Sequence, residues 1–346
     1  SVETTGLSTM FSESLPLGPY GLPHEDRGSR DHFNLKYMKV LLIKTSSLGD
    51  VVHALPAVTD AIAQGFEIHW MIEEGFSEIA SMHPGVSGVI PVAWRRWRQS
   101  LVSSAHEIRA FKRKLRETKY DVCIDSQGLI KSGVLSLLSR SSLKAGYDFR
   151  SARESIASFF YDKRITVPSR LHAIDRQRQL VSSALDYSLV KEADSGVGIR
   201  IPLKRQAFLL HGTTWESKHW PIERWINLAN LLGSEGLEVL TSWGSVRERK
   251  DAEAIASETG SVVLPRMSLK QLASKLGESI VTVGVDTGLT HLSAAIGTST
   301  IGLYGPTRID LTGCRGLRAE TISSRNGMAG ISVESVWSRI QNIMKE

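Results

Sequence analysis

The sequence predicts an α/β protein built from two doubly wound domains, each a parallel sheet with helices on both faces. Apolar runs typical of buried strands alternate with helical segments from Met38 onward, and this spacing favours parallel strands joined by crossover helices. A length of 346 residues suits two domains. A polar, glycine-containing segment at 191–198 separates two such series. We therefore expect domains at 38–190 and 191–346 that face one another across a cleft.

The first series follows a segment without periodicity. Residues 1–37 are polar and rich in Gly, Ser and Pro, so we expect a disordered leader or an upstream extension of the true start. Pro56 is expected to bend the helix that contains it, because proline cannot donate the backbone hydrogen bond. The expected elements are a strand at 39–44, a helix to about 64, a strand at 67–73, a helix near 77, a strand at 121–125, and helices at 130–138 and 171–185.

The second series repeats the alternation. The expected strands are 207–211, 237–242, 262–263, 279–285 and 300–304, and the expected helices are 222–233, 246–259, 269–277 and 289–295. We also consider that the last helix of the second domain packs back on the N-terminal domain. In folds of this kind the ligand-binding side chains lie in the loops after the strands, so those loops decide the function.

Composition narrows the function classes. The two cysteines, Cys123 and Cys314, are separated by 190 residues, which fits a reducing compartment. No run of about 18–20 apolar residues and no signal peptide is present, so we expect a cytoplasmic protein. The formal charge is +6, yet the run from Arg95 to Lys119 alone holds nine basic and two acidic residues. That run therefore carries +7 and the remaining chain −1. Much of it can be a solvated helix face, but Trp94-Arg95-Arg96-Trp97-Arg98 suits an anionic or sugar-bearing ligand.

Asp50 is the first candidate for chemistry. It closes the loop Lys44-Thr45-Ser46-Ser47-Leu48-Gly49-Asp50 at the start of a helix. Such a carboxylate can simply favour the helix dipole while a neighbouring serine caps, or it can face the cleft as a general base. Both interpretations stay open from the residues alone.

Two loops of the second series have the parts of a phosphate site. Thr213, Thr214 and Lys218 lie just before a helix, although they can equally be a cap and a solvated lysine. The stretch Val285-Asp286-Thr287-Gly288-Leu289-Thr290-His291 breaks a buried strand into a helix, so Asp286 can accept sugar hydroxyls while the next amides meet a phosphate. His291 by itself is more typical of a packed histidine. No two aspartates stand at i and i+2, so the Asp-x-Asp metal pattern is absent and no metal is expected.

At these motifs the chain resembles the lipopolysaccharide heptosyltransferases of glycosyltransferase family 9. The resemblance runs from Met38 to about Thr307. It rests on residues 44–51, Trp70 to Gly75, Ile90 to Ala93 with Arg95 to Arg98, Asp125 to Ser132, Ala152 to Glu154, Lys218 to Pro221, Val285 to Leu292, and Tyr304 to Thr307.

The resemblance implies a GT-B fold and a metal-independent, inverting transfer of heptose from ADP-heptose to the Kdo of Kdo-lipid A. It implies that Asp50 is the catalytic base. It also implies donor binding by Thr213, Thr214, Lys218, Glu248 at the ribose, Met267 at the adenine, Asp286, Thr287, Gly288, Leu289 and His291. The implied acceptor residues are Lys44, Arg95, Arg96, Arg98 and Arg153.

Other functions compete with this one. A relative can use the same donor but take a heptosylated core as acceptor, and a non-catalytic nucleotide- or nucleic-acid-binding protein can use the basic run. Against nucleic acid, the sequence has no RNP, KH or helix-turn-helix pattern. We expect instead a peripheral enzyme on the cytoplasmic face of the inner membrane, where the basic segment meets an anionic surface.

Overall fold

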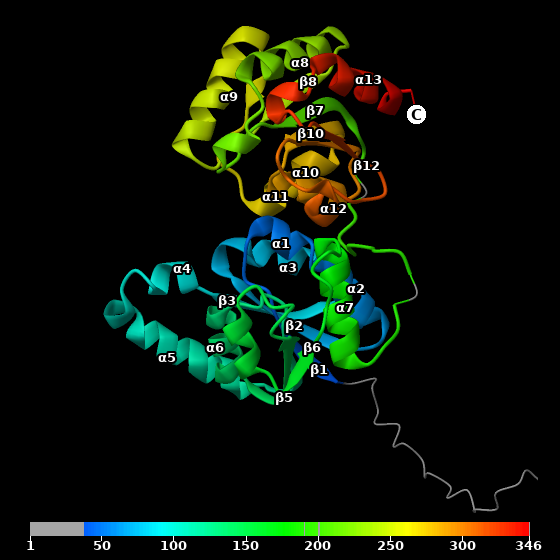
Figure 1. The fold of residues 1–346 in the computed structure, drawn as a ribbon. Coiled ribbons are helices and arrows are strands. Elements are labelled where there is room, and N and C mark those ends of the chain that lie inside the picture. The colour runs from blue at the N-terminus through cyan, green and yellow to red at the C-terminus, as the bar shows by residue number, and fades with distance from the viewer. Residues whose placement is uncertain (1–37, 190, 200, 346) are drawn as a thin grey trace, which may run out of the picture. The chain divides into compact units, whose positions relative to one another are not determined.

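The protein is described by a computed structural model that covers residues 38–189, 191–199 and 201–345 (Figure 1). The leader or extension expected at 1–37 lies outside the described residues. The described chain contains two six-stranded sheets, and every strand pair in both is parallel. An α/β fold with two parallel sheets is therefore confirmed.

The first sheet has the strand order β3-β2-β1-β4-β5-β6. Its strands are β1 (Lys39–Ile43), β2 (Glu67–Glu73), β3 (Val86–Val92), β4 (Lys119–Asp125), β5 (Arg140–Tyr147) and β6 (Lys163–Ile165). Its helices are α1 (Leu48–Val52), α2 (Leu55–Ala63), α3 (Ser77–Met82), α4 (Trp94–Trp97), α5 (Leu101–Glu117), α6 (Ile130–Leu138) and α7 (Ala173–Leu185), with short 3-10 turns at η2 (Glu74–Phe76) and η3 (Ser155–Phe160).

The second sheet has the order β12-β11-β10-β7-β8-β9, which is the same topology counted from its own first strand. Its strands are β7 (Lys204–Leu210), β8 (Glu238–Thr241), β9 (Val262–Val263), β10 (Ser279–Val285), β11 (Thr300–Tyr304) and β12 (Ala319–Ser323). Its helices are α8 (Ile222–Ser234), α9 (Val246–Thr259), α10 (Leu269–Gly277), α11 (Gly288–Ala295), α12 (Ile309–Thr312) and α13 (Val333–Ile343), with η4 (Glu216–Lys218) and η5 (Met328–Gly330).

The central strands explain why these runs fold as they do. In β1, Val40 and Leu42 enter one hydrophobic core and Leu41 and Ile43 enter another, so successive side chains pack on opposite faces of the sheet. A strand covered on both faces needs an unbroken apolar run, and such runs are the parts of the chain that periodicity identified.

Several elements match the sequence closely. Helices were expected at 130–138, 246–259 and 269–277 and occur as α6, α9 and α10. The strands β3, β5, β6 and β12 were missed. In β3 the pattern is interrupted by Gly88 and Pro91 and no side chain before Val92 is fully buried, so the apolar signal of a central strand is lacking there.

Two expectations about helices are wrong. Pro56 does not bend a continuous helix, because the chain breaks after α1 and Pro56 stands in the first turn of α2, where its missing N–H has no helical partner to lose. The last helix, α13, does not return to the first half. Its buried Val336 and Ile340 belong to the core of the second sheet, and α13 packs against α8.

Helices α1 and α11 cross closely, and two glycines make the crossing possible. A Cβ on Gly288 would lie 2.6 Å from Leu48 Cγ and 2.9 Å from the backbone nitrogen of Gly49. A Cβ on Gly49 would lie 3.3 Å from His291 Cδ2. The first turn of each helix therefore approaches the other closely, with the side chains of Leu48 and His291 in the contact, and each first turn follows a loop that the sequence singled out.

Candidate active site

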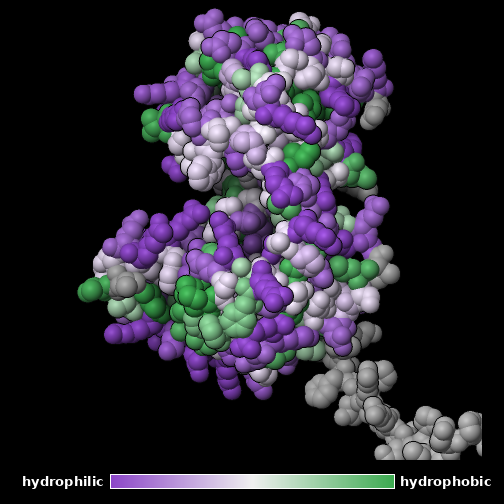
Figure 2. All heavy atoms as spheres, viewed as in Figure 1, coloured by the Kyte–Doolittle hydropathy of each residue, from purple (hydrophilic) through white to green (hydrophobic). Residues whose placement is uncertain are grey.

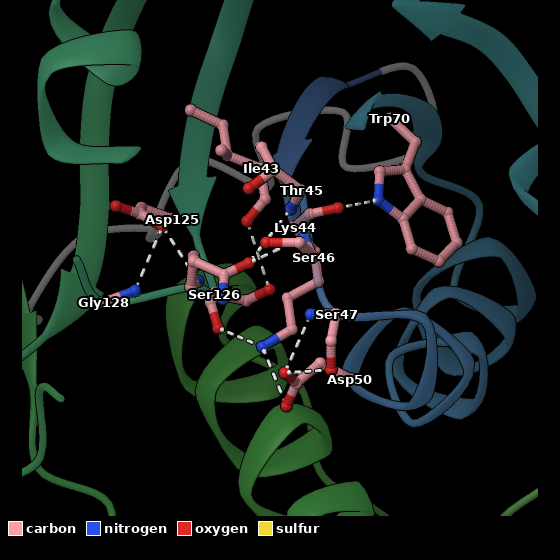
Figure 3. Close-up of polar contacts among 11 residues, drawn as sticks. Ile43, Lys44, Thr45, Ser46, Ser47, Asp50, Trp70, Asp125, Ser126 and Gly128 are labelled. Carbon is pink, nitrogen blue, oxygen red and sulfur yellow. Dashed lines mark hydrogen bonds and ion pairs between the residues drawn. The ribbon is translucent and has the colours of Figure 1, made fainter. Parts of the chain in front are cut away.

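Each sheet has one place where the strand order reverses. In the first sheet it lies between β1 and β4, whose following loops turn toward opposite faces and leave a crevice at the carboxyl ends of the strands. Figure 3 shows the loop after β1 resting on the loop after β4. The backbone N–H groups of Thr45 and Ser46 donate to Gln127 Oε1 at 3.0 and 3.2 Å, and this fixes the loop that carries Asp50.

Lys44 and Asp50 form the charged pair of this crevice. The buried Lys44 ammonium donates to the carbonyl oxygen of Ser126 at 3.2 Å and lies 3.9 Å from Asp50 Oδ1. The other oxygen, Asp50 Oδ2, accepts the backbone N–H of Ser47 at 2.9 Å and its hydroxyl at 3.0 Å. Asp50 is thus a helix cap through one oxygen, while the second is directed to the lysine.

The environment keeps Asp50 ionised. Burial raises the pKa of the Asp50 carboxyl, but the Lys44 charge and the hydrogen bonds from Ser47 lower it, and the net pKa lies below its ordinary value. Burial lowers the pKa of Lys44, against the attraction of Asp50 and Asp125. With 35% of its side chain exposed, Asp50 is accessible to a ligand.

A cavity of about 360 Å³ opens beside this pair. Both charged groups line it, and most other lining groups belong to the first half of the chain: Ser126, Gln127, Tyr147, Arg150, Ser151, Ala152, Arg153, Ser169, Leu171, Ala173, Arg176 and Gln177. Leu311 and Thr312 of α12 close one side. Four cationic side chains around one carboxylate make this a cavity for an anionic ligand.

The second sheet reverses its order between β7 and β10, and there Lys218 meets Asp286. The two side chains form an ion pair of 2.6 Å, and the hydroxyl of Thr307 donates to the same Asp286 oxygen at 2.8 Å. Burial raises the pKa of Asp286, but hydrogen bonds from His291, Lys218 and Thr307 outweigh it and bring the pKa to about 2. The loops that follow three neighbouring strands of the sheet, β7, β10 and β11, therefore meet at one carboxylate.

The remaining expected donor residues lie on loops and first helical turns of the second sheet. Thr213 and Thr214 lie in the same loop as Lys218, and Thr287 precedes the first turn of α11, which begins with Gly288 and Leu289. Glu248 accepts the N–H groups of Gly244 and Ser245 at 2.6 and 3.0 Å through Oε2, and its side chain lies against Gly212. Met267 is half-buried before α10.

His291 connects the two crevices. Its Nε2 lies 3.5 Å from Asp286 Oδ1, and its Nδ1 lies 3.3 Å from Nε2 of His53, one helical turn after Asp50. Burial lowers the pKa of His53 well below its ordinary value, and the nearby His291 and His172 lower it further. A neutral His53 can therefore share a hydrogen bond with His291 without charge repulsion.

The arginines of the basic run lie apart from the cavity. Arg95, Arg96 and Arg98 are exposed on or directly after α4 and are not among the cavity-lining residues. Arg96 forms ion pairs with Glu107 at 2.6 Å and Glu74 at 3.2 Å, and Arg95 lies over the Phe76 ring. Arg153, by contrast, lines the cavity with Lys44.

Sequence reasoning missed several lining residues. Gln127 belongs to a motif quoted above, yet no role was assigned to it. Arg176 lies on α7, far from any quoted motif, and only the fold brings it beside Tyr147, with its guanidinium 5.3 Å from the ring. The sequence contained a signal for His53, because a residue three positions after Asp50 in a helix lies on the same face as Asp50.

No group of three or more His, Cys, Asp or Glu side chains arranged to hold a metal ion occurs within residues 38–189, 191–199 and 201–345.

Two parallel sheets of this order, with a lysine–carboxylate pair at each reversal point, match the GT-B arrangement of a class of two-domain glycosyltransferases. The chain belongs to glycosyltransferase family 9 (heptosyltransferase), whose family model matches residues 108–336. It is 44% identical over 297 residues to lipopolysaccharide heptosyltransferase 1 of Pseudomonas aeruginosa, covering 81% of this chain and 82% of the relative.

Solved structures agree with the family. The E. coli heptosyltransferase WaaC with ADP has a TM-score of 0.83 at 37% identity, covering 88% of this chain and 100% of that one. The same enzyme with ADP-2-deoxy-2-fluoro heptose has a TM-score of 0.80 at 37% identity, covering 88% of this chain and 99% of that one. E. coli ADP-heptose lps heptosyltransferase II, at 18% identity and a TM-score of 0.73 over 89% and 98% of the chains, shares the fold.

Asp286 gives a testable pH dependence. Its pKa in the folded protein, about 2, is below the ordinary 3.8, so the ionised group stabilises the fold above about pH 4, and this contribution is lost as the pH falls toward 2. Between pH 5 and pH 2 the free energy of unfolding should drop on the order of 2 kcal/mol more in the wild type than in Asp286→Asn. Denaturant titration at each pH measures this.

The control is Asp310→Asn, which removes an exposed carboxylate paired with Arg308. In this variant the free energy of unfolding should fall between pH 5 and pH 2 almost as much as in the wild type. An equal loss of unfolding free energy between pH 5 and pH 2 in the wild type and in Asp286→Asn would contradict the stabilising role of the Lys218–Asp286 pair.

Proposed function

We propose that the protein transfers heptose from ADP-heptose to the Kdo of Kdo-lipid A in lipopolysaccharide inner-core synthesis, with inversion and without a metal ion. The observation that carries this proposal is the pairing of an accessible carboxylate in a cationic cavity with a lysine-bearing loop at the second reversal point. Family membership and relatives named lipopolysaccharide heptosyltransferase 1 support the same reaction.

The donor belongs to the second half of the chain, residues 191–346. Thr213, Thr214 and Lys218 hold the diphosphate together with the first-turn amides of α11, because a helix N-terminus and an ammonium both stabilise phosphate charge. Asp286 accepts heptose hydroxyls, and Glu248 and Met267 bind the ribose and adenine. The ADP and ADP-2-deoxy-2-fluoro heptose bound by WaaC support a nucleotide diphosphate sugar at this position.

The acceptor belongs to the first half, residues 38–190. A Kdo unit carries a carboxylate, and Lys44, Arg153 and the neighbouring Arg150 and Arg176 offer the matching charges around the cavity. Arg95, Arg96 and Arg98 lie outside that cavity and bind phosphates farther along the acceptor. An anionic acceptor of this kind suits the cavity better than the neutral sugar of a heptosylated core.

Asp50 is the general base of the transfer. Its Oδ1 removes the proton from the acceptor hydroxyl while that oxygen attacks the anomeric carbon of heptose, and the bond from that carbon to the ADP oxygen breaks on the opposite side. The depressed pKa of Asp50 keeps the base ionised at neutral pH. Lys218 and the α11 amides stabilise the negative charge that develops on ADP, which is the task a metal ion performs in other transferases.

The enzyme works at the cytoplasmic face of the inner membrane as a peripheral protein, since its lipid acceptor is anchored there. No helix among the described residues is long and apolar enough to cross a bilayer. The basic segment 95–119 contributes surface contacts with the anionic headgroups.

The decisive experiment is incubation of the purified protein with ADP-heptose and Kdo-lipid A while ADP release is followed, with and without EDTA. Transfer should require both substrates and should be unchanged by EDTA. Loss of transfer on chelation would overturn the metal-independent mechanism. Transfer to a heptosylated core but not to Kdo-lipid A would overturn the assigned acceptor.

Asp50→Asn tests the base. Because the amide cannot take up a proton, kcat should fall by at least about 10³-fold, whereas the dissociation constant for ADP-heptose should change less than about threefold. Single-turnover kinetics and calorimetry separate these quantities. Asp162→Asn, an exchange of the same kind at an exposed residue that does not line the cavity, serves as control. Near-normal turnover in Asp50→Asn would remove this residue from the mechanism.

Arg153→Ala tests the acceptor assignment. The loss of one charged contact with the acceptor should raise the acceptor KM roughly tenfold and leave donor affinity unchanged. The matched control is Arg140→Ala, an exposed arginine that does not line the cavity. A change in donor affinity alone would place the acceptor elsewhere.

A further inference from the structure

An apolar surface lies uncovered on helix α6. Ile130, Val134 and Leu137 are exposed at positions i, i+4 and i+7, so they form one face of this helix, and Leu137 is 50% exposed. Leu135, on the other face, is fully packed in the core of the first sheet. The helix is therefore apolar on two faces, of which one is packed in the core and the other is partly exposed.

Neighbouring segments extend this surface. Ile156 and Phe159 of η3 are 58% and 70% exposed, and the Phe149 ring meets the Phe159 ring at a centroid distance of 4.9 Å. η3 packs on α6, where the Phe160 ring fills the space that a side chain at Gly133 would need. We name these side chains the apolar ridge: Ile130, Val134, Leu137, Phe149, Ile156 and Phe159.

Clustering distinguishes the ridge from ordinary exposed apolar residues. Single exposed apolar side chains are common on soluble proteins, but contiguous groups of large ones mark contact with a partner or a membrane. Figure 2 shows apolar side chains gathered over the part of the molecule where Figure 1 labels α6, with hydrophilic side chains around them.

The surroundings of the ridge are mainly cationic, with Glu154, which accepts the N–H of Ile130, as an exposed carboxylate among them. Arg164 lies over the Phe149 ring, and Arg150 and Arg153 are exposed between Phe149 and Ile156. Burial lowers the pKa of Lys131 on α6, and the nearby charges act in both directions, with Glu73 and Glu154 raising it and Arg95 and Arg98 lowering it. Helix α5 packs against α6 and adds exposed basic residues: Arg109, Lys112, Arg113, Lys114 and Arg116.

We propose that the apolar ridge and its cationic surround form a docking surface for an anionic lipid bilayer. Apolar side chains that enter the acyl boundary, surrounded by Lys and Arg that meet anionic headgroups, are the two components of interfacial membrane binding. The charge complementarity commits the surface to this occupant, because a second copy of the chain would bring the same cations against it.

The ridge also begins beside the acceptor cavity. Gln127 lines the cavity and stands three residues before Ile130, and Arg150 and Arg153 belong to both regions. A lipid with its headgroup in the cavity would therefore have its acyl chains on the ridge side, in the bilayer. This orientation rests on the proposed function, whereas the docking surface itself rests on exposure and charge.

Vesicle binding of the full chain, without substrates, tests the surface. Vesicles of phosphatidylcholine with 30% phosphatidylglycerol should bind the protein in co-sedimentation, and phosphatidylcholine alone should bind it at least about tenfold less. The double variant Leu137→Ser/Phe159→Ser should lose about tenfold or more of the affinity for the anionic vesicles. Its thermal unfolding should match the wild type, because both side chains are exposed.

The matched control is Leu317→Ser/Val262→Ser, which removes two exposed apolar side chains of the second half, 95% and 40% exposed, and should bind vesicles like the wild type. Equal vesicle binding by the ridge variant and the wild type would overturn the proposal. So would a wild-type dimer in sedimentation without lipid that the ridge variant abolishes, since the ridge would then join two copies.

Transfer to a deacylated, water-soluble acceptor separates this proposal from the proposed function. The ridge variant should retain that activity while it loses activity on acceptor embedded in vesicles. If neither the wild type nor the ridge variant transfers heptose, but only the wild type binds anionic vesicles, the proposed function fails and the docking surface stands.

Discussion

The strand order of the two sheets is the constraint on which the site depends. Because β1 and β4, and likewise β7 and β10, send their connections to opposite faces, no crossover helix fills the space between the following loops. Each crevice is thus a place where charged side chains can lie near the core and still meet a ligand. Each contains one lysine and one carboxylate, an arrangement that reduces the cost of burying either charge.

The two pairs differ in the distance between lysine and carboxylate, and this difference supports the different roles proposed for them. Lys218 and Asp286 are 2.6 Å apart, with Thr307 on the same carboxylate oxygen, so Asp286 is held and strongly ionised. Lys44 and Asp50 are 3.9 Å apart, and one Asp50 oxygen caps its own helix. The looser contact leaves Asp50 Oδ1 able to receive a proton without breaking the cap, which suits a base better than a clamp.

Sequence patterns predicted the parts of the molecule that depend on local order. The strands β1, β2, β10 and β11 and capped helices such as α9, with Ser245 and Glu248 in a capping box, were located to the residue or nearly so. Edge strands such as β3 and β6 were missed, because weak burial leaves no apolar run. Asp50 and Asp286 were identified as candidates because they follow buried strands, whereas Arg176 and Tyr147 meet only through tertiary packing.

The close crossing of α1 and α11 links the loops that carry the two charged pairs. Gly49 and Gly288 let the first turns of the helices meet, and His53 and His291 continue the contact between side chains. His291 also lies near Asp286, so a ligand that draws Lys218 away from Asp286 changes the charge that faces His291. The diphosphate of the proposed donor is such a ligand, since it competes for the same ammonium. Asp286 would then keep Thr307 and His291 as partners, and the helix that bears Asp50 packs directly on His291. One short set of contacts, from Lys218 through Asp286 and His291 to the helix that bears Asp50, therefore joins the loop of the proposed donor site to the proposed base.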